Sequence, residues 1–215
     1  MNSNWPYDSI VVSGADAQTY LHSQLSQDLR GLVVGGESWS FVLEPTGRVV
    51  ALVLVRRTGD DTFDLRVARG GGEALATRLN RFRLRVKAEI AVGEGSEGNA
   101  AAYVVERVRA GWPAMGAEIT EATIPAELGH VVAQAVSFTK GCYPGPEHVE
   151  RLDCRSAQAP RRLALLRLAP GQVLDGSVGE ITSSIPDGDG ALALALVRRG
   201  ADVPGEIALG DPAQG

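Results

Sequence analysis

Residues 39–67 read WSFVLEPTGRVVALVLVRRTGDDTFDLRV and carry the pattern of three successive strands. Apolar side chains at every second position are typical of a strand with one buried face. Short stretches containing Pro, Gly and Asp separate such runs in β-hairpins. We therefore expect strands at residues 39–43, 49–55 and 63–67, joined by turns at 45–47 and 58–61.

Helical spacing flanks this hairpin region on both sides. Between Gly14 and Leu29 apolar residues recur every four positions, which predicts a helix with one buried face that Ser13 or Asp16 could cap. Residues 74–82 repeat the helical spacing, and residues 84–90 look extended. An antiparallel sheet combined with helices defines the α+β class, which we expect here.

The pattern changes beyond residue 160. Short apolar runs at 163–168, 178–185 and 192–197 predict strands, and no helix-length periodicity follows residue 160. The sequence thus predicts an α+β domain over residues 1–160 and a small C-terminal β-barrel module over residues 161–215.

Composition narrows the function classes. The net charge of −5 argues against a nucleic-acid partner, and no apolar run approaches the roughly 20 residues of a membrane helix. The N-terminal residues lack a secretory signal pattern, so we expect a cytoplasmic protein. Two cysteines, Cys142 and Cys154, predict reduced thiols rather than a disulfide framework, and we expect no metal site.

The stretch most typical of ligand contact is KGCYPGPE, residues 140–147. It places a thiol and an aromatic ring between two glycines, which permit sharp turns or close approach to a ligand. Pro146 and Glu147 suit the first turn of a short helix. Cys142 would lie just before that helix, where free N–H groups and Lys140 could lower its pKa. A small buried residue in a tight turn is the alternative interpretation of Cys142.

Basic residues gather around this stretch. Residues 140–167 contain six Lys or Arg and three Asp or Glu, a surplus of 6 − 3 = +3 that would suit an anionic ligand. We therefore predict Cys142 as a reactive thiol, and a ligand-binding set of Lys140, Gly141, Tyr143, Gly145, Glu147 and Arg151.

The same stretch resembles the K-G-C-[FY]-x-G-Q-E signature of YgfZ-type folate-binding proteins, which are relatives of the glycine-cleavage T-protein, an aminomethyltransferase. Pro146 stands where that family has Gln, so a side-chain amide contact is replaced by a proline ring. Further segments resemble the family in the same order along the chain, among them residues 20–29, 43–50 and 81–90.

The resemblance implies a tetrahydrofolate-binding scaffold that supports assembly or repair of iron–sulfur enzymes, with iron–sulfur assembly proteins as partners and a link to tRNA modification. The resemblance also implies a difference between this chain and the T-protein. In the T-protein, an Asp in an Asn-rich segment after the third strand holds the folate. The corresponding residues here, 67–75, contain neither Asn nor Asp. We therefore expect no aminomethyltransferase activity, unless Glu73 takes that role.

Two alternatives remain open. One is a folate-dependent one-carbon or thiol-transfer enzyme in which Cys142 is the nucleophile. The other is a degenerate family member that has lost folate and serves as a protein-interaction module.

Overall fold

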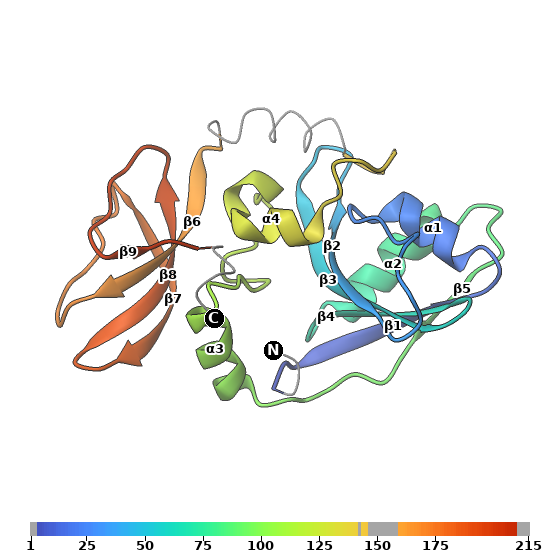
Figure 1. Ribbon diagram of the computed structural model, residues 1–215, viewed down its shortest axis with the longest axis horizontal. Coiled ribbons are helices and arrows are strands. Elements are labelled where there is room, and N and C mark those ends of the chain that lie inside the picture. Colours follow the sequence, from blue (N-terminus) through green and yellow to red (C-terminus); the bar gives the residue numbers. More distant parts are fainter. Residues whose placement is uncertain (1–3, 142, 146–158, 210–215) are drawn as a thin grey trace.

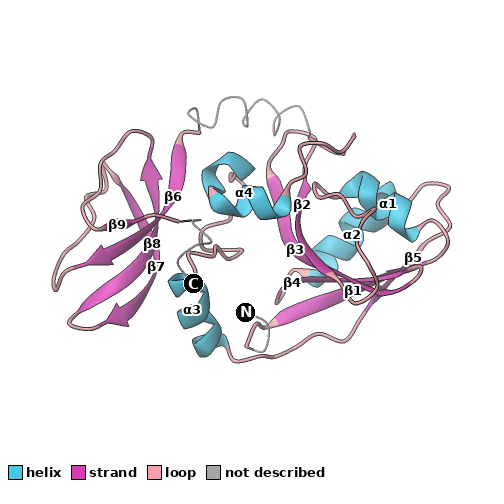
Figure 2. Cartoon of the chain, viewed as in Figure 1, coloured by secondary structure: helices cyan, strands magenta, loops and turns pink. Residues whose placement is uncertain are grey.

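The structure is a computed structural model that describes residues 4–141, 143–145 and 159–209. Its described residues form two antiparallel sheets with helices beside and between them (Figure 1; Figure 2). This arrangement confirms the predicted α+β class. The structure does not test the predicted domain boundary at residue 160.

The first sheet contains five strands in the order β2-β3-β4-β1-β5. The predicted strands at 39–43, 49–55 and 63–67 are confirmed as β2, β3 and β4, and neighbouring strands pair antiparallel throughout. Their bounds are β1 Tyr7–Ser13, β2 Glu37–Leu43, β3 Val49–Gly59, β4 Thr62–Ala68 and β5 Glu89–Val92.

Two helices cover one face of this sheet: α1 (Ala17–Gln24) and α2 (Gly72–Phe82). Leu21 of α1 and Leu79 of α2 pack on Val12 and Leu65 of the sheet, and all four are fully buried. Burial of one stripe on each helix explains the four-residue spacing in the sequence.

The first helix is shorter than predicted. It ends at Gln24, and the backbone of the following Leu25 is extended, although Leu25 and Leu29 remain buried in the same core. Asp16 precedes the helix without capping it, because its carboxylate accepts a hydrogen bond from the backbone N–H of Lys87 at 2.8 Å. The four-residue spacing therefore marks continued burial beyond the end of the helix.

The opposite face of the first sheet meets the segment between the two sheets. This segment contains α3 (Ala100–Arg109), the 3-10 helix η1 (Pro125–Leu128) and α4 (His130–Ala135). Phe41 and Leu52 of the sheet form a buried cluster with Trp112, Leu128 and Val131. Figure 1 shows α3 and α4 lying between the sheets.

The second sheet contains four strands in the order β7-β8-β6-β9. The predicted strands at 163–168, 178–185 and 192–197 are confirmed as β6, β7 and β8. Leu165 and Leu194 on one face pack against Val108 of α3. The bounds are β6 Arg161–Leu168, β7 Gly179–Asp187, β8 Gly190–Arg198 and β9 Glu206–Ile207.

The predicted C-terminal barrel is not seen. A barrel requires pairing between its first and last strands. Within the described residues β7 and β9 are the two free edges of an open sheet, and β9 has only two residues. The C-terminal module is therefore an open sheet in the described residues, and the predicted barrel is wrong there.

Candidate functional site

The three tryptophans of the chain meet in one place, although they are far apart in the sequence. The ring centroids of Trp5 and Trp39 are 5.4 Å apart, and those of Trp39 and Trp112 are 4.8 Å apart. Trp5 precedes β1, Trp39 belongs to β2, and Trp112 follows α3. Tyr103 of α3 joins the group, with its ring 6.3 Å from that of Trp5.

These rings border a cavity of about 460 Å³ between the first sheet and α3. Such a volume is within the range of small-molecule sites, which are mostly apolar with a few polar groups. The polar side chains at this cavity are Arg69, Arg107 and Tyr103. The remaining lining consists of Trp5, Pro6, Trp39, Leu52, Ala68, Ala100, Val104, Trp112, Pro113, Ala114, Met115, Gly116 and Ala117.

Tyr103 gives the cavity a neutral hydroxyl group. Burial raises the pKa of Tyr103 to about 12, so its phenol keeps its proton at any physiological pH. A neutral phenol can donate one hydrogen bond and accept others. Among the described residues no hydrogen bond to this hydroxyl is present, so it can serve a ligand.

Arg69 and Arg107 differ in their freedom to meet a ligand. Arg69 is about half exposed at the cavity edge and pairs with Asp8 and Glu97. Arg107 is buried, and it donates to the Glu118 carboxylate at 3.0 Å and to the Trp112 carbonyl at 3.4 Å. Arg107 therefore positions the loop that carries Trp112, whereas Arg69 retains an exposed guanidinium edge.

Glu118 extends this network to the second sheet. Its carboxylate is completely buried and accepts hydrogen bonds from the hydroxyls of Thr182 at 2.7 Å and Ser183 at 2.6 Å. Ser183 also accepts from Arg107 at 2.6 Å. The side of the cavity that bears Trp112 is thus tied to β7 as well as to α3.

The structure places Lys140 away from this cavity, in a cage of backbone carbonyls at the end of α1. Its ammonium group donates to the carbonyls of Leu25 at 2.6 Å, Gln27 at 3.1 Å and His22. Burial lowers the pKa of Lys140 to about 8, so the group is still mostly protonated at neutral pH. All three ammonium donors have partners within the chain. The predicted ligand contact of Lys140 stays a prediction.

Tyr143 and Gly145 pack the same segment onto the first hairpin. Tyr143 is buried in the cluster that contains Trp112, and the Lys140 ammonium lies 5.1 Å from its ring centroid. Gly145 has φ +78°, and a Cβ there would lie 2.7 Å from the carbonyl oxygen of Glu44. Gly141 is exposed, with no atom near the Cβ position. None of these residues lines the tryptophan cavity.

Three predicted site residues, Cys142, Glu147 and Arg151, lie outside the described residues, as does the predicted helix start at Pro146. Their roles stay predictions. Among the described residues no group of three His, Cys, Asp or Glu side chains could hold a metal ion. No helix in the described ranges is long and apolar enough to cross a membrane.

The predicted site set contained none of the tryptophans. The segments that bear them lie in separate elements, so no local motif joins them. The composition does give one indication of the cavity. Aromatic residues make up only 5% of the chain, yet three of them are tryptophans.

The described fold is similar to that of the solved glycine cleavage system aminomethyltransferase T from Bartonella henselae, with a TM-score of 0.71 and 15% sequence identity. The match covers 89% of this chain and 76% of that chain. At this identity the likeness establishes the fold.

Sequence similarity extends to an uncharacterized protein of Haemophilus influenzae. The two are 29% identical over an alignment of 189 residues, and the match covers 70% of this chain and 68% of that protein. No family model matches the chain.

Proposed function

We propose that the tryptophan cavity binds the flat ring system of tetrahydrofolate. The protein would then be a YgfZ-like folate-binding protein that supports assembly or repair of iron–sulfur enzymes. The observation that carries the proposal is the convergence of Trp5, Trp39 and Trp112 on one cavity of about 460 Å³. The YgfZ and iron–sulfur parts are supported by the sequence resemblance of residues 140–147 and of the segments in family order.

The chemistry of the cavity suits a pterin. A flat heterocycle gains about 1–3 kcal/mol from stacking on an aromatic side chain. The neutral Tyr103 hydroxyl can bond to a ring nitrogen or carbonyl, and the exposed edge of Arg69 can meet an acceptor at the rim. These groups favour a neutral, planar ring with polar edges.

There is also room for the rest of a folate molecule. A hollow of about 780 Å³ lies along the turn of the first hairpin, and Met115 and Gly116 line both this hollow and the tryptophan cavity. A ligand longer than a pterin could therefore continue past Met115 toward the turn at residues 44–48. Gly145 packs against the same turn, which brings residues 143–145 close to this end.

We infer binding without aminomethyl transfer. Residues 67–75, where the T-protein resemblance would place its Asp, form the end of β4 and the start of α2. Glu73 lies in the first turn of α2 and lines a different hollow, together with Asp8, Thr77 and Asn80. It is absent from the lining of the tryptophan cavity, so it does not substitute for that Asp there.

Tryptophan fluorescence tests the proposal, because every tryptophan of the chain borders the cavity. Titration with tetrahydrofolate should quench the emission in a saturable manner, beyond the inner-filter loss measured with free N-acetyltryptophanamide. Quenching that matches the free amide at all concentrations would remove the proposal. The conservative variant Tyr103→Phe should retain quenching at a weaker affinity, since it loses only the hydroxyl.

A further inference from the structure

A second cavity lies on the C-terminal sheet and has no part in the proposed folate site. Its volume is about 510 Å³. It opens where β7 begins, beside the loop that precedes β7. It is lined by Arg161, Val173, Leu174, Gly176, Gly179, Glu180, Ile181, Leu196 and Arg198.

Two arginines occupy one end of this cavity. Arg161 on β6 and Arg198 on β8 are directly opposite each other in the antiparallel register. Like charges in directly opposed positions destabilise a sheet unless an anion offsets them. Arg161 has such a partner in Glu127, at 3.0 Å, whereas Arg198 has no ion pair among the described residues. One guanidinium therefore remains available to an anion.

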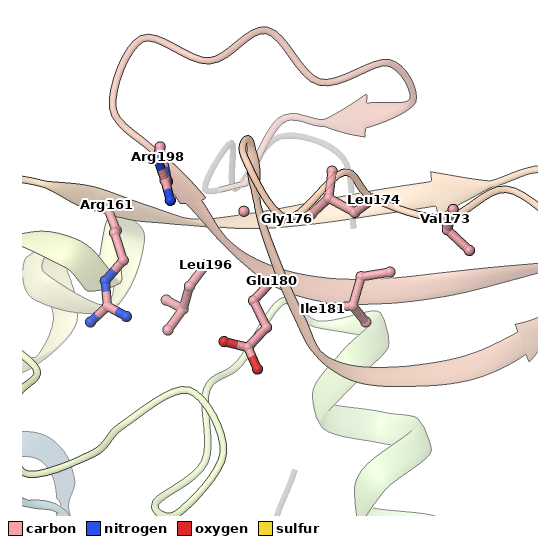
Figure 3. A pocket seen from close by; sticks show the side chains of 9 residues that line it. Arg161, Val173, Leu174, Gly176, Glu180, Ile181, Leu196 and Arg198 are labelled. Carbon is pink, nitrogen blue, oxygen red and sulfur yellow. The ribbon is translucent and has the colours of Figure 1, made fainter.

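The other end of the cavity is apolar. Figure 3 shows Val173, Leu174 and Ile181 at the end away from the arginines, with Glu180 between the two ends. Val173 is 82% exposed, which leaves a large apolar side chain in water at the rim. A ligand that covered it would gain roughly 25 cal/mol for each Å² of apolar surface removed from water.

Close packing of the β7 backbone on β8 fixes the position of Glu180 in the cavity. A Cβ at Gly179 would lie 2.6 Å from the carbonyl oxygen of Leu196, so only glycine allows β7 to approach β8 this closely. Glu180 follows directly and pairs in register with Leu196. Glu180 has no ion pair among the described residues, so its carboxylate can accept from a donor on the ligand.

We propose that this cavity binds a small carboxylate with a branched apolar tail. The carboxylate pairs with Arg198 beside Arg161, and the tail lies on Leu174, Ile181 and Val173. Two classes of compound fit this description: free short-chain acids and α-amino acids with an apolar side chain. Glu180 favours the α-amino acid, because its carboxylate belongs to a cavity-lining residue between the two ends and can pair with an α-ammonium group.

Amide chemical shifts of the full-length protein test this proposal with three matched probes: 4-methylpentanoate, L-leucine and 3-methylbutan-1-amine. The first two should shift the amides of Gly176, Gly179 and Glu180 at millimolar concentration, and the amine, which has no carboxylate, should not. If neither carboxylate moves these amides, or if the amine moves them equally, the proposal is wrong.

Variants separate the roles of the charged groups. Arg198→Gln should weaken both carboxylates about tenfold, as expected for loss of a charge-assisted hydrogen bond. Arg199→Gln is the control, since Arg199 is exposed next to Arg198 but does not line the cavity. Equal affinities in these two variants would overturn the proposal.

Glu180→Gln distinguishes the two sources of the carboxylate. A weaker affinity for L-leucine, with that for 4-methylpentanoate unchanged, identifies an amino-acid site. Unchanged affinity for both, together with the Arg198 effect, identifies a site for free short-chain acids. Failure of these tests leaves the folate proposal untouched, because the two cavities share no lining residue.

Discussion

The guanidinium of Arg107 donates to the carboxylate of Glu118 at 3.0 Å, and the two side chains are 6% and 0% exposed. This pair joins α3 to the loop that carries Trp112, and through Ser183 it reaches the second sheet. A buried pair of this kind is strongly destabilising to break, because the remaining charge loses its partner in a place that water does not reach.

Arg107→Met is therefore expected to lower the free energy of unfolding by about 3 kcal/mol, measured by urea denaturation. The control is Arg109→Met on the same helix, where the arginine is exposed and should change stability by less than about 0.5 kcal/mol. Equal stabilities of the two variants would show that the buried pair does not hold the α3 region.

Gly145→Ala is expected to destabilise the protein by more than about 1 kcal/mol, because an L-residue at φ +78° is strained and its Cβ would meet the Glu44 carbonyl. Gly141→Ala lies four residues earlier, has free space at the Cβ position and should be nearly neutral. Thermal unfolding of both variants measures the difference. A neutral Gly145→Ala would contradict the packing of this segment on the hairpin turn.

Lys140→Met should cost about 2 kcal/mol of stability, since three carbonyl groups at the end of α1 lose their shared donor. Lys87→Met is the matched control, because the Lys87 side chain is exposed. If Lys140 instead serves mainly as a ligand contact, its variant would keep the wild-type stability and lose ligand affinity.

The side chain of His130 should lower the free energy of unfolding in mild acid. Burial lowers its pKa below 6.5, and neither ring nitrogen has a hydrogen-bond partner among the described residues. Below pH 6.5 the unfolded chain binds a proton at this position before the folded chain does, so the free energy of unfolding falls as the pH falls. His130→Phe should flatten this part of the profile between pH 7.5 and 5.5, measured by urea denaturation. A variant profile parallel to that of the wild type would refute the assignment.

Much of the first sheet was predictable because its turns are explicit in the sequence. The turn at residues 45–47 sets the start of β3, and alternation then gives β2 and β4. The extended stretch at 84–90 was only partly correct, since only Glu89–Val92 pair with β1. A strand forms only where a neighbouring strand pairs with it. The sequence of residues 84–88 does not indicate that a partner strand is missing there.

The candidate cavity was not predictable from local patterns. Trp5, Trp39 and Trp112 come together only because the segment after α3, which carries Trp112, packs on the face of the first sheet opposite α1 and α2. Lys140 illustrates the reverse problem. A lysine in a glycine-rich stretch suggests a contact with an anion, but its partners here are backbone carbonyls, which every residue carries.

The central claim is that the tryptophan cavity is the folate site, and calorimetric titration of tetrahydrofolate into the wild type and Trp39→Leu tests it most directly. Phe82→Leu, which alters an exposed ring on α2 outside the cavity, is the control. We expect binding at or below the millimolar range to the wild type and the control, and an affinity at least about tenfold weaker for a folded Trp39→Leu. No binding to the wild type, or equal affinity in all three proteins, would contradict the claim.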